Sequence, residues 1–406
     1  MTESDYYLCV TPFFPSPNRW QGAFVLDQVK AIQRHSKYKV LVFKTDSFTS
    51  NEDNYVIDGV QVYSIRPLLM PSYFLNGLTE NIVGSSFVKL LHSLGVDPQR
   101  VKYVHCHTAS HSAFGFGVRR INPKTKVLVQ FHDLDPYSLR NGFWADKRWN
   151  VRYRAKKSLS AFERADLLIS ISTPVQDNLL AFPKARPQEV FTGYLDQLKW
   201  LEDYPSLKSR KTYILYNGVD YSLFFPKTET KSPSGVFRIG CIANFQEIKD
   251  HITLIKAFEI LIKKGYPDMR LSLLGSGETR SFCEQYISDN GLDPFVEWPK
   301  EMDHSKLLDY YHSLSLFVLP SVFEGFGCVY TEAHACGIPF MGVYNQGAAE
   351  LIPMEDREKW LIQPHDYIRL GEIIEQYYKK REQQTLSCSI DINELVKDFL
   401  DYLETL

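Results

Sequence analysis

The order in which apolar and amphipathic segments follow one another most constrains the fold of this chain. Short apolar runs rich in β-branched residues alternate with segments of helical period along nearly the whole length. In one such pair, the run Phe237–Ala243 precedes a helical segment that Asp250 can cap and Gly265 can end. Alternation of this kind predicts parallel, doubly wound sheets, so we expect an α/β fold.

The alternation runs through once, pauses over residues 182–234 and starts again. The runs that predict strands are Tyr6–Val10, Lys39–Phe43, Val60–Ile65, Val101–His105, Val127–Phe131 and Leu167–Ser172 before the pause, and Phe237–Ala243, Arg270–Leu274, Phe295–Trp298, Leu314–Leu319 and Phe340–Val343 after it. A length of 406 residues also suits two α/β domains of near-equal size.

We therefore expect two Rossmann-like domains, over residues 1–220 and 236–390, joined by a linker over 221–235. Residues 391–406 form an acidic amphipathic segment, which we expect to be a helix that packs back at the domain junction. Ligands of open α/β sheets bind beyond the carboxyl ends of the strands. If the two domains face each other across a cleft, the chemistry should lie in loops that directly follow strands.

Composition narrows the class of partner and the compartment. A formal net charge of -2 gives no general basic surplus for nucleic acid, so an anionic ligand must be met by a local cationic site. Seven cysteines without a Cys-x-x-Cys pair favour reduced thiols. The amino-terminal residues lack the pattern of a signal peptide, and no run approaches the ~18 apolar residues that span a bilayer. We expect a cytoplasmic protein, with peripheral attachment to the inner face of the cell membrane as an option.

A loop with two glutamates carries most of the chemical information. Glu324 and Glu332 are eight positions apart, and Gly325, Phe326 and Gly327 lie between them. The glycines let backbone N–H groups approach a ligand closely, and the helix that follows aims its positive end at the same place. These features predict a site for a phosphate group.

The two glutamates occupy positions that suit different roles. Glu332 lies about one turn into the helix, where its carboxylate can accept hydrogen bonds from paired hydroxyls such as those of a ribose. Glu324 lies in the loop itself and can hold hydroxyls of a sugar beyond the phosphate. A loop of this kind alone is more often a turn than a binding site, but its position after a buried strand favours function.

This stretch resembles the signature of glycosyltransferase family 4 (the retaining, group 1 type with a GT-B fold), in which two glutamates eight apart flank a Gly-Phe-Gly loop. Five further segments resemble family motifs in the expected order, at residues 13–32, 127–136, 214–226, 237–258 and 271–278. The matching segments are distributed over most of the chain, so the resemblance concerns both expected domains.

The resemblance implies roles for residues outside the glutamate loop. Lys249 would neutralise the donor diphosphate, and Gly275 would lie in the donor-binding glycine turn. The Gly22 N–H would meet the diphosphate from the other wall of the cleft, and His132 would contact the transferred sugar near its anomeric carbon. Taken alone, Lys249 is an ordinary solvated lysine, Gly22 a turn glycine and His132 a strand-end histidine with its hydrogen bonds satisfied.

Asn244 departs from the family pattern, which commonly has an arginine that forms a cationic pair with the lysine. An asparagine can donate hydrogen bonds to a phosphate oxygen, but it brings no charge. We still count Asn244 among the donor-binding residues, with weaker stabilisation of the leaving group.

The implied activity is transfer of a hexose-like unit from a nucleoside diphosphate sugar to an acceptor hydroxyl of a glycan, polysaccharide or lipid-linked sugar, as in polysaccharide biosynthesis. The resemblance implies retention by front-face attack, without a metal ion and without a cofactor other than the donor. Two alternatives stay open: a nucleotide-sugar 2-epimerase of the same architecture, and a non-catalytic subunit that binds the sugar nucleotide. An NAD-dependent enzyme is disfavoured, because no Gly-x-Gly-x-x-Gly follows the first strand.

A cluster of metal-ligand residue types occurs at His105, Cys106, His107 and His111. On a continuing strand, His105 and Cys106 would point to opposite faces, and no second ligand cluster stands out. We therefore predict no zinc site there.

A cationic segment over Lys147–Lys157 carries six basic residues and includes Trp149, with Trp144 just before it. It is either a solvated helix face, a contact with an anionic lipid surface, or a site for a phosphorylated acceptor, because basic residues interleaved with aromatics suit the headgroup region.

Overall fold

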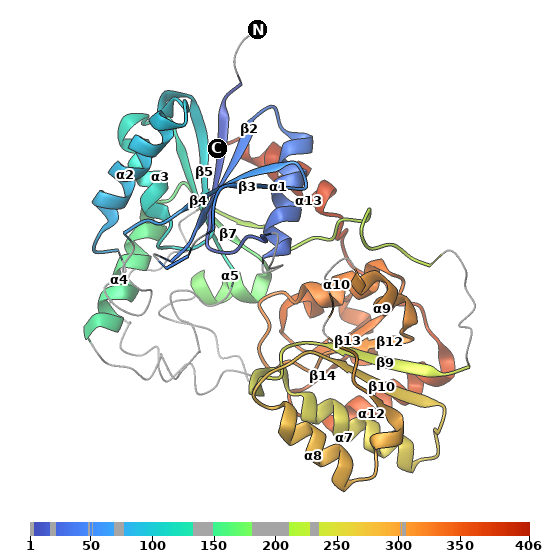
Figure 1. Cartoon of the computed structure of the whole chain (residues 1–406). Helices are drawn as coiled ribbons and strands as arrows, with labels where there is room; N and C mark the ends of the chain where they lie inside the picture. Colours follow the sequence, from blue (N-terminus) through green and yellow to red (C-terminus); the bar gives the residue numbers. More distant parts are fainter. Residues whose placement is uncertain are drawn as a thin grey trace. The chain divides into compact units, whose positions relative to one another are not determined.

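The computed structural model describes residues 4–16, 22–47, 49–50, 52–68, 77–132, 149–180, 211–227, 235–300, 302 and 306–406. The chain divides into two compact units: Met1–Asn217 with Ile392–Leu406, and Gly218–Asp391 (Figure 1). Each unit is built around a largely or wholly parallel sheet with helices between its strands, so the predicted α/β class is confirmed. No helix in the described part of the chain is long and apolar enough to cross a membrane.

The first unit contains an eight-stranded sheet, counted over the described residues, in the order β3-β4-β2-β1-β5-β6-β7-β8. Its strands are β1 (Tyr6–Thr11), β2 (Lys39–Thr45), β3 (Tyr55–Ile57), β4 (Val60–Ile65), β5 (Val101–Cys106), β6 (Lys126–Phe131), β7 (Leu167–Ser170) and β8 (Thr212–Ile214). All neighbouring pairs are parallel except β3 with β4.

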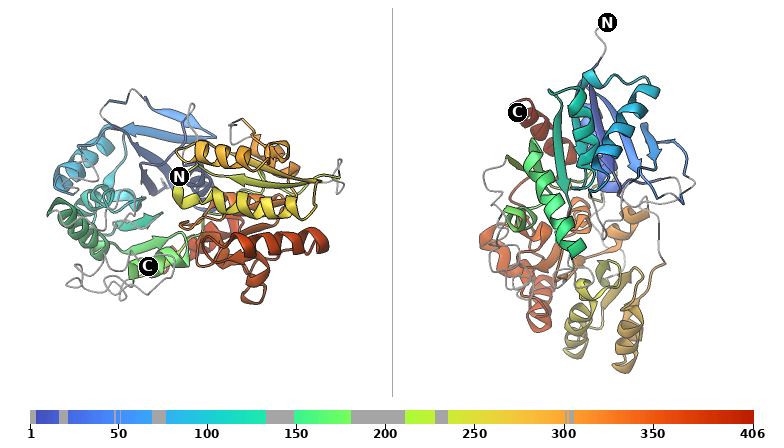
Figure 2. Two further views of the ribbon diagram at one scale, coloured as in Figure 1. Left: turned by 90° about the horizontal axis from the view of Figure 1, so that it is seen from below. Right: turned by 90° about the vertical axis from the view of Figure 1, so that its left-hand side faces the viewer.

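Helices cover both faces of this sheet (Figures 1 and 2). On one side lie α1 (Ala23–His35) and α13 (Ile392–Leu403), and on the other α2 (Glu80–Ser93), α3 (Ser112–Ile121) and α4 (Trp149–Arg164). The unit also contains α5 (Thr173–Leu180) and a 3₁₀ turn at Pro98–Arg100.

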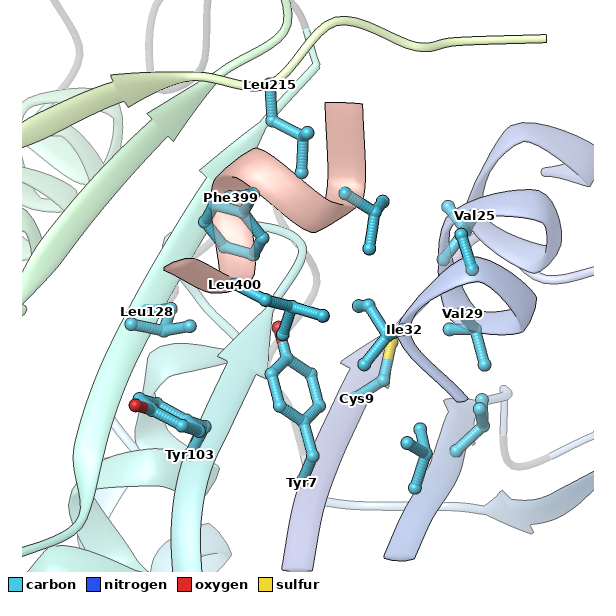
Figure 3. Packing of buried hydrophobic residues seen from close by; sticks show 14 of the residues in the cluster. Tyr7, Cys9, Val25, Val29, Ile32, Tyr103, Leu128, Leu215, Phe399 and Leu400 are labelled. Atoms are coloured by element: carbon cyan, nitrogen blue, oxygen red, sulfur yellow. The ribbon is translucent and has the colours of Figure 1, made fainter. Parts of the chain in front are cut away.

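The carboxy-terminal helix α13 is part of the core of the first unit. Phe399 and Leu400 lie in one buried cluster with Tyr7 of β1, Val29 of α1 and Leu128 of β6 (Figure 3). Full burial of such side chains contributes roughly 1.5–3 kcal/mol each. The last helix of the chain therefore stabilises the unit that contains the first strand.

The second unit contains a six-stranded, fully parallel sheet in the order β11-β10-β9-β12-β13-β14. Its strands are β9 (Phe237–Ile242), β10 (Met269–Leu274), β11 (Val296–Glu297), β12 (Leu316–Val318), β13 (Phe340–Val343) and β14 (Leu361–Ile362). The strand order reverses between β9 and β12, and such a switch point is where open α/β sheets bind ligands.

Helices also cover both faces of this second sheet (Figures 1 and 2). They are α7 (His251–Lys263), α8 (Arg280–Asp289), α9 (Leu307–Ser313), α10 (Cys328–Ala335), α11 (Arg357–Trp360) and α12 (Tyr367–Lys380), with 3₁₀ turns at Glu247–Lys249, Asp293–Phe295, Gly347–Leu351 and Met354–Asp356. Figure 1 shows α9 and α10 on one face and α7, α8 and α12 on the other.

Each predicted apolar run overlaps a strand of the structure. Three strands were not predicted: β3, β8 and β14, with three, three and two residues. All three are short and lie at the outer position of a sheet.

The units divide at Asn217 and Gly218, ahead of the linker predicted over 221–235. The reason is that the following residues pack on the second unit: Val219 N–H donates to the Ile390 carbonyl (2.7 Å), and the Phe224 ring contacts Tyr311. Residues 228–234 of the predicted linker lie outside the described residues. The chain returns to the first unit after Asp391.

Candidate active site

Except for Gly22, the predicted donor residues lie in the second unit, on or just after three loops at the carboxyl end of its sheet. Asn244 and Lys249 follow β9, Gly275 follows β10, and the loop that starts at Glu324 follows β12. These three strands are neighbours in the order β10-β9-β12 and are parallel, so their carboxyl ends lie side by side at the same end of the sheet. The sheet thus brings together residues that are far apart in the sequence.

Lys249 and Glu324 form an ion pair at this end of the sheet. The distance from Lys249 Nζ to Glu324 Oε2 is 2.5 Å, and the side chains are only 19% and 14% exposed. Their loops are also joined through the main chain, because Val322 N–H donates to the Ile248 carbonyl at 2.9 Å. Ser321 Oγ lies 3.4 Å from the same carboxylate oxygen. The lysine predicted for the diphosphate and the glutamate predicted for the sugar therefore contact each other directly.

Gly327 connects the glutamate loop to α10. It is the N-cap residue, with φ 78° in the left-handed region. A Cβ at this position would lie 2.6 Å from the Tyr330 ring and 2.9 Å from Glu324 Cγ, so a larger residue would displace the glutamate. The amino end of α10, with its partial positive charge, thus begins beside Glu324, while Gly325 and Phe326 are buried within the loop.

Glu332 is anchored from the neighbouring helix α9. Tyr311 Oη donates a hydrogen bond of 2.7 Å to Glu332 Oε2. Tyr311 is fully buried, and this burial together with the charge of Glu332 raises the pKa of its phenol. The hydroxyl therefore stays protonated and fixes one oxygen of the carboxylate.

Gly275 allows the loops after β9 and β10 to touch. Its φ is 144°, and a Cβ there would lie 2.1 Å from the Ala243 carbonyl oxygen. Asn244, next to Ala243, is exposed at this end of the sheet, and its carbonyl accepts the Gln246 N–H at 2.8 Å. Any side chain at Gly275 would push the loop that carries Asn244 away.

Gly22 and His132 belong to the first unit. Gly22 is the N-cap residue of α1 with φ 90°, and a Cβ there would lie 2.5 Å from the Phe13 carbonyl carbon. His132 directly follows β6, and its ring lies against Phe13 and Phe24 at centroid distances of 5.9 and 5.1 Å. Both residues thus meet the segment that follows β1.

His132, which is half-buried, continues a row that begins with the buried His105 and His107. His107 Nδ1 lies 3.0 Å from His132 Nε2, and the planes of the two rings are nearly parallel, at 8°. His105 stacks on His107 at 4.5 Å and shares a hydrogen bond of 2.7 Å with Tyr7 Oη. Burial lowers the pKa of His105 to about 3 and the pKa of His107 as well, so the row is neutral at neutral pH.

His111, the remaining histidine of the predicted cluster, is bonded elsewhere. Its Nε2 lies 2.8 Å from Thr45 Oγ1, and its ring stacks on Phe114. Cys106 Sγ approaches the Val104 carbonyl at 3.8 Å. Across the described ranges, no group of three or more His, Cys, Asp or Glu side chains is arranged to hold a metal ion.

The cationic segment lies partly on α4. Trp149 is 65% exposed, Lys156 is exposed, and Lys157 Nζ lies 5.6 Å from the centroid of the Tyr153 ring. Trp144, Lys147 and Arg148 lie outside the described residues.

Two residues at the site were not identified from the sequence. Gln346, after β13, accepts the Glu324 N–H on its Oε1 at 3.0 Å. The sequence could have indicated Gln346, because it lies in a loop directly after a predicted strand, as Asn244, Gly275 and Glu324 do. Tyr311 carried no such signal, since its contact with Glu332 depends on how α9 packs.

Comparisons with known proteins identify the family of the chain. Residues 226–386 match the model described as "Glycosyl transferases group 1", and residues 21–193 match the model of Glycosyltransferase Family 4. The chain belongs to the family 4 glycosyltransferases. The matches fall on both units, as the sequence motifs predicted.

Among curated relatives, this glycosyltransferase is 28% identical over 170 residues to a D-inositol 3-phosphate glycosyltransferase of Arthrobacter sp. (strain FB24), which covers 40% of each chain. The chain thus spans about two fifths of the length of the curated relatives that it matches first.

Solved structures resemble the whole chain. HepE of Anabaena in complex with UDP has a TM-score of 0.66 at 18% identity, covering 99% of this chain and 100% of that one. Sucrose-phosphate synthase of Thermosynechococcus elongatus has a TM-score of 0.64 at 18% identity, covering 98% and 94%. These likenesses show the GT-B fold for this glycosyltransferase.

Proposed function

We propose that this glycosyltransferase moves a hexose-like unit from a nucleoside diphosphate sugar to an acceptor hydroxyl. The observation that carries the proposal is the meeting of Lys249 and Glu324 at the amino end of α10. A cation and a helix end meet the anionic diphosphate, while a carboxylate accepts hydrogen bonds from sugar hydroxyls. A neighbouring fold, HepE of Anabaena, was solved with UDP and with UDP-glucose, which supports a donor of this class.

The chemical barrier lies in breaking the anomeric C–O bond while negative charge builds on the leaving diphosphate. Preorganised donors that meet this developing charge lower the barrier. Lys249 supplies a full charge, and the first turn of α10 supplies backbone N–H groups and a partial positive charge. Asn244 is exposed at the same end of the sheet and contributes only hydrogen bonds, so we assign most of the electrostatic stabilisation to Lys249.

We propose that transfer retains the anomeric configuration by front-face attack, with the leaving phosphate accepting the acceptor's proton. Both glutamates belong to the second unit with Asn244, Lys249 and Gly275, and Glu332 already shares one oxygen with Tyr311. We therefore assign neither glutamate as a nucleophile. Because a lysine and a helix end meet the phosphate charge, the reaction we propose has no step for a divalent metal ion.

We place acceptor binding in the first unit. The acceptor classes we propose are glycans, polysaccharides and lipid-linked sugars. Support comes from relatives such as the capsular polysaccharide biosynthesis glycosyltransferase CapM of Staphylococcus aureus, 28% identical over 143 residues. The exposed Trp149 and the neighbouring basic residues make α4 our candidate for peripheral contact with the inner face of the cell membrane, from the cytoplasm.

A calorimetric panel of UDP, GDP and ADP sugars tests the proposal, with Lys249→Ala as the paired variant. We expect one nucleotide sugar to bind the wild type and to be transferred equally well after EDTA treatment. Lys249→Ala should lose on the order of 2–4 kcal/mol of transition-state stabilisation, as for loss of one preorganised donor. Conversion of the donor to a free epimer would show an epimerase, and binding without any turnover would show a non-catalytic subunit.

A further inference from the structure

Gln346 is a buried polar residue beside the glutamate loop, and only one end of its amide forms a hydrogen bond. It lies between β13 and the 3₁₀ turn Gly347–Leu351, and its side chain is only 2% exposed. Its Oε1 accepts the Glu324 N–H at 3.0 Å. Because a backbone N–H can only donate, this bond fixes which end of the amide faces Glu324.

The other end of the amide is buried without a bond. Gln346 Nε2 has no hydrogen-bond partner among the residues that the structure describes. A buried N–H donor without an acceptor costs free energy, so such groups call for an explanation. This nitrogen lies on the same amide that holds the main chain of Glu324.

The segment around Gln346 also holds the next part of the loop. Ala348 N–H donates to the Phe326 carbonyl at 2.7 Å. Gly347 has φ 40°, and a Cβ there would lie 2.3 Å from the same carbonyl oxygen. The residues after β13 therefore fix the main chain of the glutamate loop at two points.

Binding of a donor would change the partner of the Glu324 carboxylate. This carboxylate is paired with Lys249. A donor diphosphate carries more than one negative charge and would compete with Glu324 for this lysine. If the diphosphate draws Lys249 away, the carboxylate needs another hydrogen-bond donor nearby. Gln346 Nε2 is a buried donor in need of an acceptor, attached to the amide that already contacts residue 324.

We propose that Gln346 is a positioning residue for Glu324. When Lys249 pairs with a bound nucleoside diphosphate, Gln346 Nε2 donates a hydrogen bond to the Glu324 carboxylate. Its Oε1 holds the main chain of Glu324 throughout. The carboxylate is thereby fixed for the sugar instead of repelling the phosphate. This inference rests on the proposed function, because it requires the diphosphate to bind at Lys249.

A double-mutant cycle tests whether Gln346 acts through Glu324. The variants are Gln346→Met, Glu324→Ala and their combination, with calorimetric binding of UDP, GDP and ADP as the readout. We expect Gln346→Met to weaken binding about 3–10-fold, the equivalent of one hydrogen bond, in the wild-type background. In the Glu324→Ala background, Gln346→Met should weaken nucleotide binding less than about twofold. Equal losses in both backgrounds, or no loss in either, would overturn the proposal.

Gln384 provides the matched control. It is also a buried glutamine that binds main chain, and its amide both accepts the Phe340 N–H at 2.9 Å and donates to the Phe340 carbonyl at 2.8 Å. Gln384→Met should lower the free energy of unfolding without changing nucleotide affinity. If it weakens binding as much as Gln346→Met does, the effect is structural and the proposal fails.

A measurement on the wild type avoids any folding defect of the variants. The side-chain amide resonance of Gln346 should shift downfield when the nucleoside diphosphate is added, because Nε2 gains an acceptor. In Glu324→Ala the resonance should not move, and a shift there would contradict the proposal. If the wild type binds none of the nucleotides, the proposed function itself fails, which is a different outcome.

Discussion

Lys249 Nζ lies 2.5 Å from Glu324 Oε2, although the two residues are 75 positions apart in the sequence. Each is the other's nearest opposite charge at the end of the sheet where we place the donor. A bound diphosphate must therefore compete with Glu324 for Lys249, and this competition makes the affinity for the nucleotide depend on both residues.

Glu324→Gln should tighten the binding of a nucleoside diphosphate while it lowers turnover of the sugar donor. The change removes a competitor for Lys249 and a negative charge near the phosphates. We expect about 2–5-fold tighter binding, the scale of one partly exposed ion pair. Calorimetry with UDP, GDP and ADP measures it. The control is Glu375→Gln on α12, which breaks a similar pair with Lys264 (2.7 Å) and should leave the nucleotide affinity unchanged. Weaker binding in Glu324→Gln would contradict the competition.

Asn244→Arg should also tighten nucleoside diphosphate binding. Asn244 is exposed on the loop that carries Lys249, so an arginine there can reach the same anion with a full charge. Asn244→Ala is the control and should bind slightly more weakly than the wild type. If the arginine variant binds more weakly than the alanine variant, the side chain at position 244 does not face the phosphates.

Glu332→Gln should weaken donor binding more than it slows the chemical step. A contact with the ribose is made equally in the ground state and the transition state, so its loss raises KM and leaves kcat nearly unchanged. Tyr311→Phe should have the same signature with a smaller effect, because it removes only the hydrogen bond that orients Glu332. A fall in kcat with an unchanged KM would place Glu332 at the reacting atoms.

The buried histidines should make the protein sensitive to mild acid. Burial lowers the pKa of His105 to about 3 and of His111 and His251 to about 4, from the unfolded value of 6.5. Below pH 6.5 the unfolded chain takes up protons that the folded chain does not. Each group is therefore fully stabilising above pH 6.5 and loses up to ~1.4 kcal/mol per pH unit toward pH 4.

Urea unfolding at several pH values between 7.5 and 4.5 measures this effect. His251 stacks on Phe245 at 3.9 Å, and neither of its ring nitrogens has a hydrogen-bond partner in the described part of the chain. His251→Phe should therefore fold and should reduce the pH dependence by about one proton. An unchanged slope in that variant would mean that His251 is protonated in the folded protein.

The cationic segment Lys147–Lys157 should bind anionic vesicles at low salt. Attraction to a charged surface acts within about a Debye length of ~8–10 Å, and each basic residue near the surface contributes ~1 kcal/mol. Lys156→Glu should therefore weaken cosedimentation with vesicles, and Trp149 fluorescence should shift to the blue on binding. If vesicles do not bind while Lys156→Glu still lowers transfer, the segment binds an anionic acceptor. If neither responds, α4 presents a solvated face.

Local sequence patterns were enough to predict the α/β class, most of the strands and the loop conformations that depend on near neighbours. Gly327 shows why: a left-handed N-cap between a strand and a helix is a local requirement, and a glycine there is visible in the sequence. The resemblance to family 4 depended on local segments of the same kind. The short edge strands β3, β8 and β14 were not predicted from local pattern.

Which side chains meet depends on how the strands and helices pack, and no local pattern predicts it. Lys249 reaches Glu324 because β9 and β12 are neighbours in the sheet, an order that no local pattern encodes. Tyr311 reaches Glu332, and Gln346 holds the Glu324 main chain, through the packing of separate elements. Hydrogen bonds and ion pairs are formed at distances of about 3 Å, so they depend on the placement of whole strands and helices, which the folded core fixes.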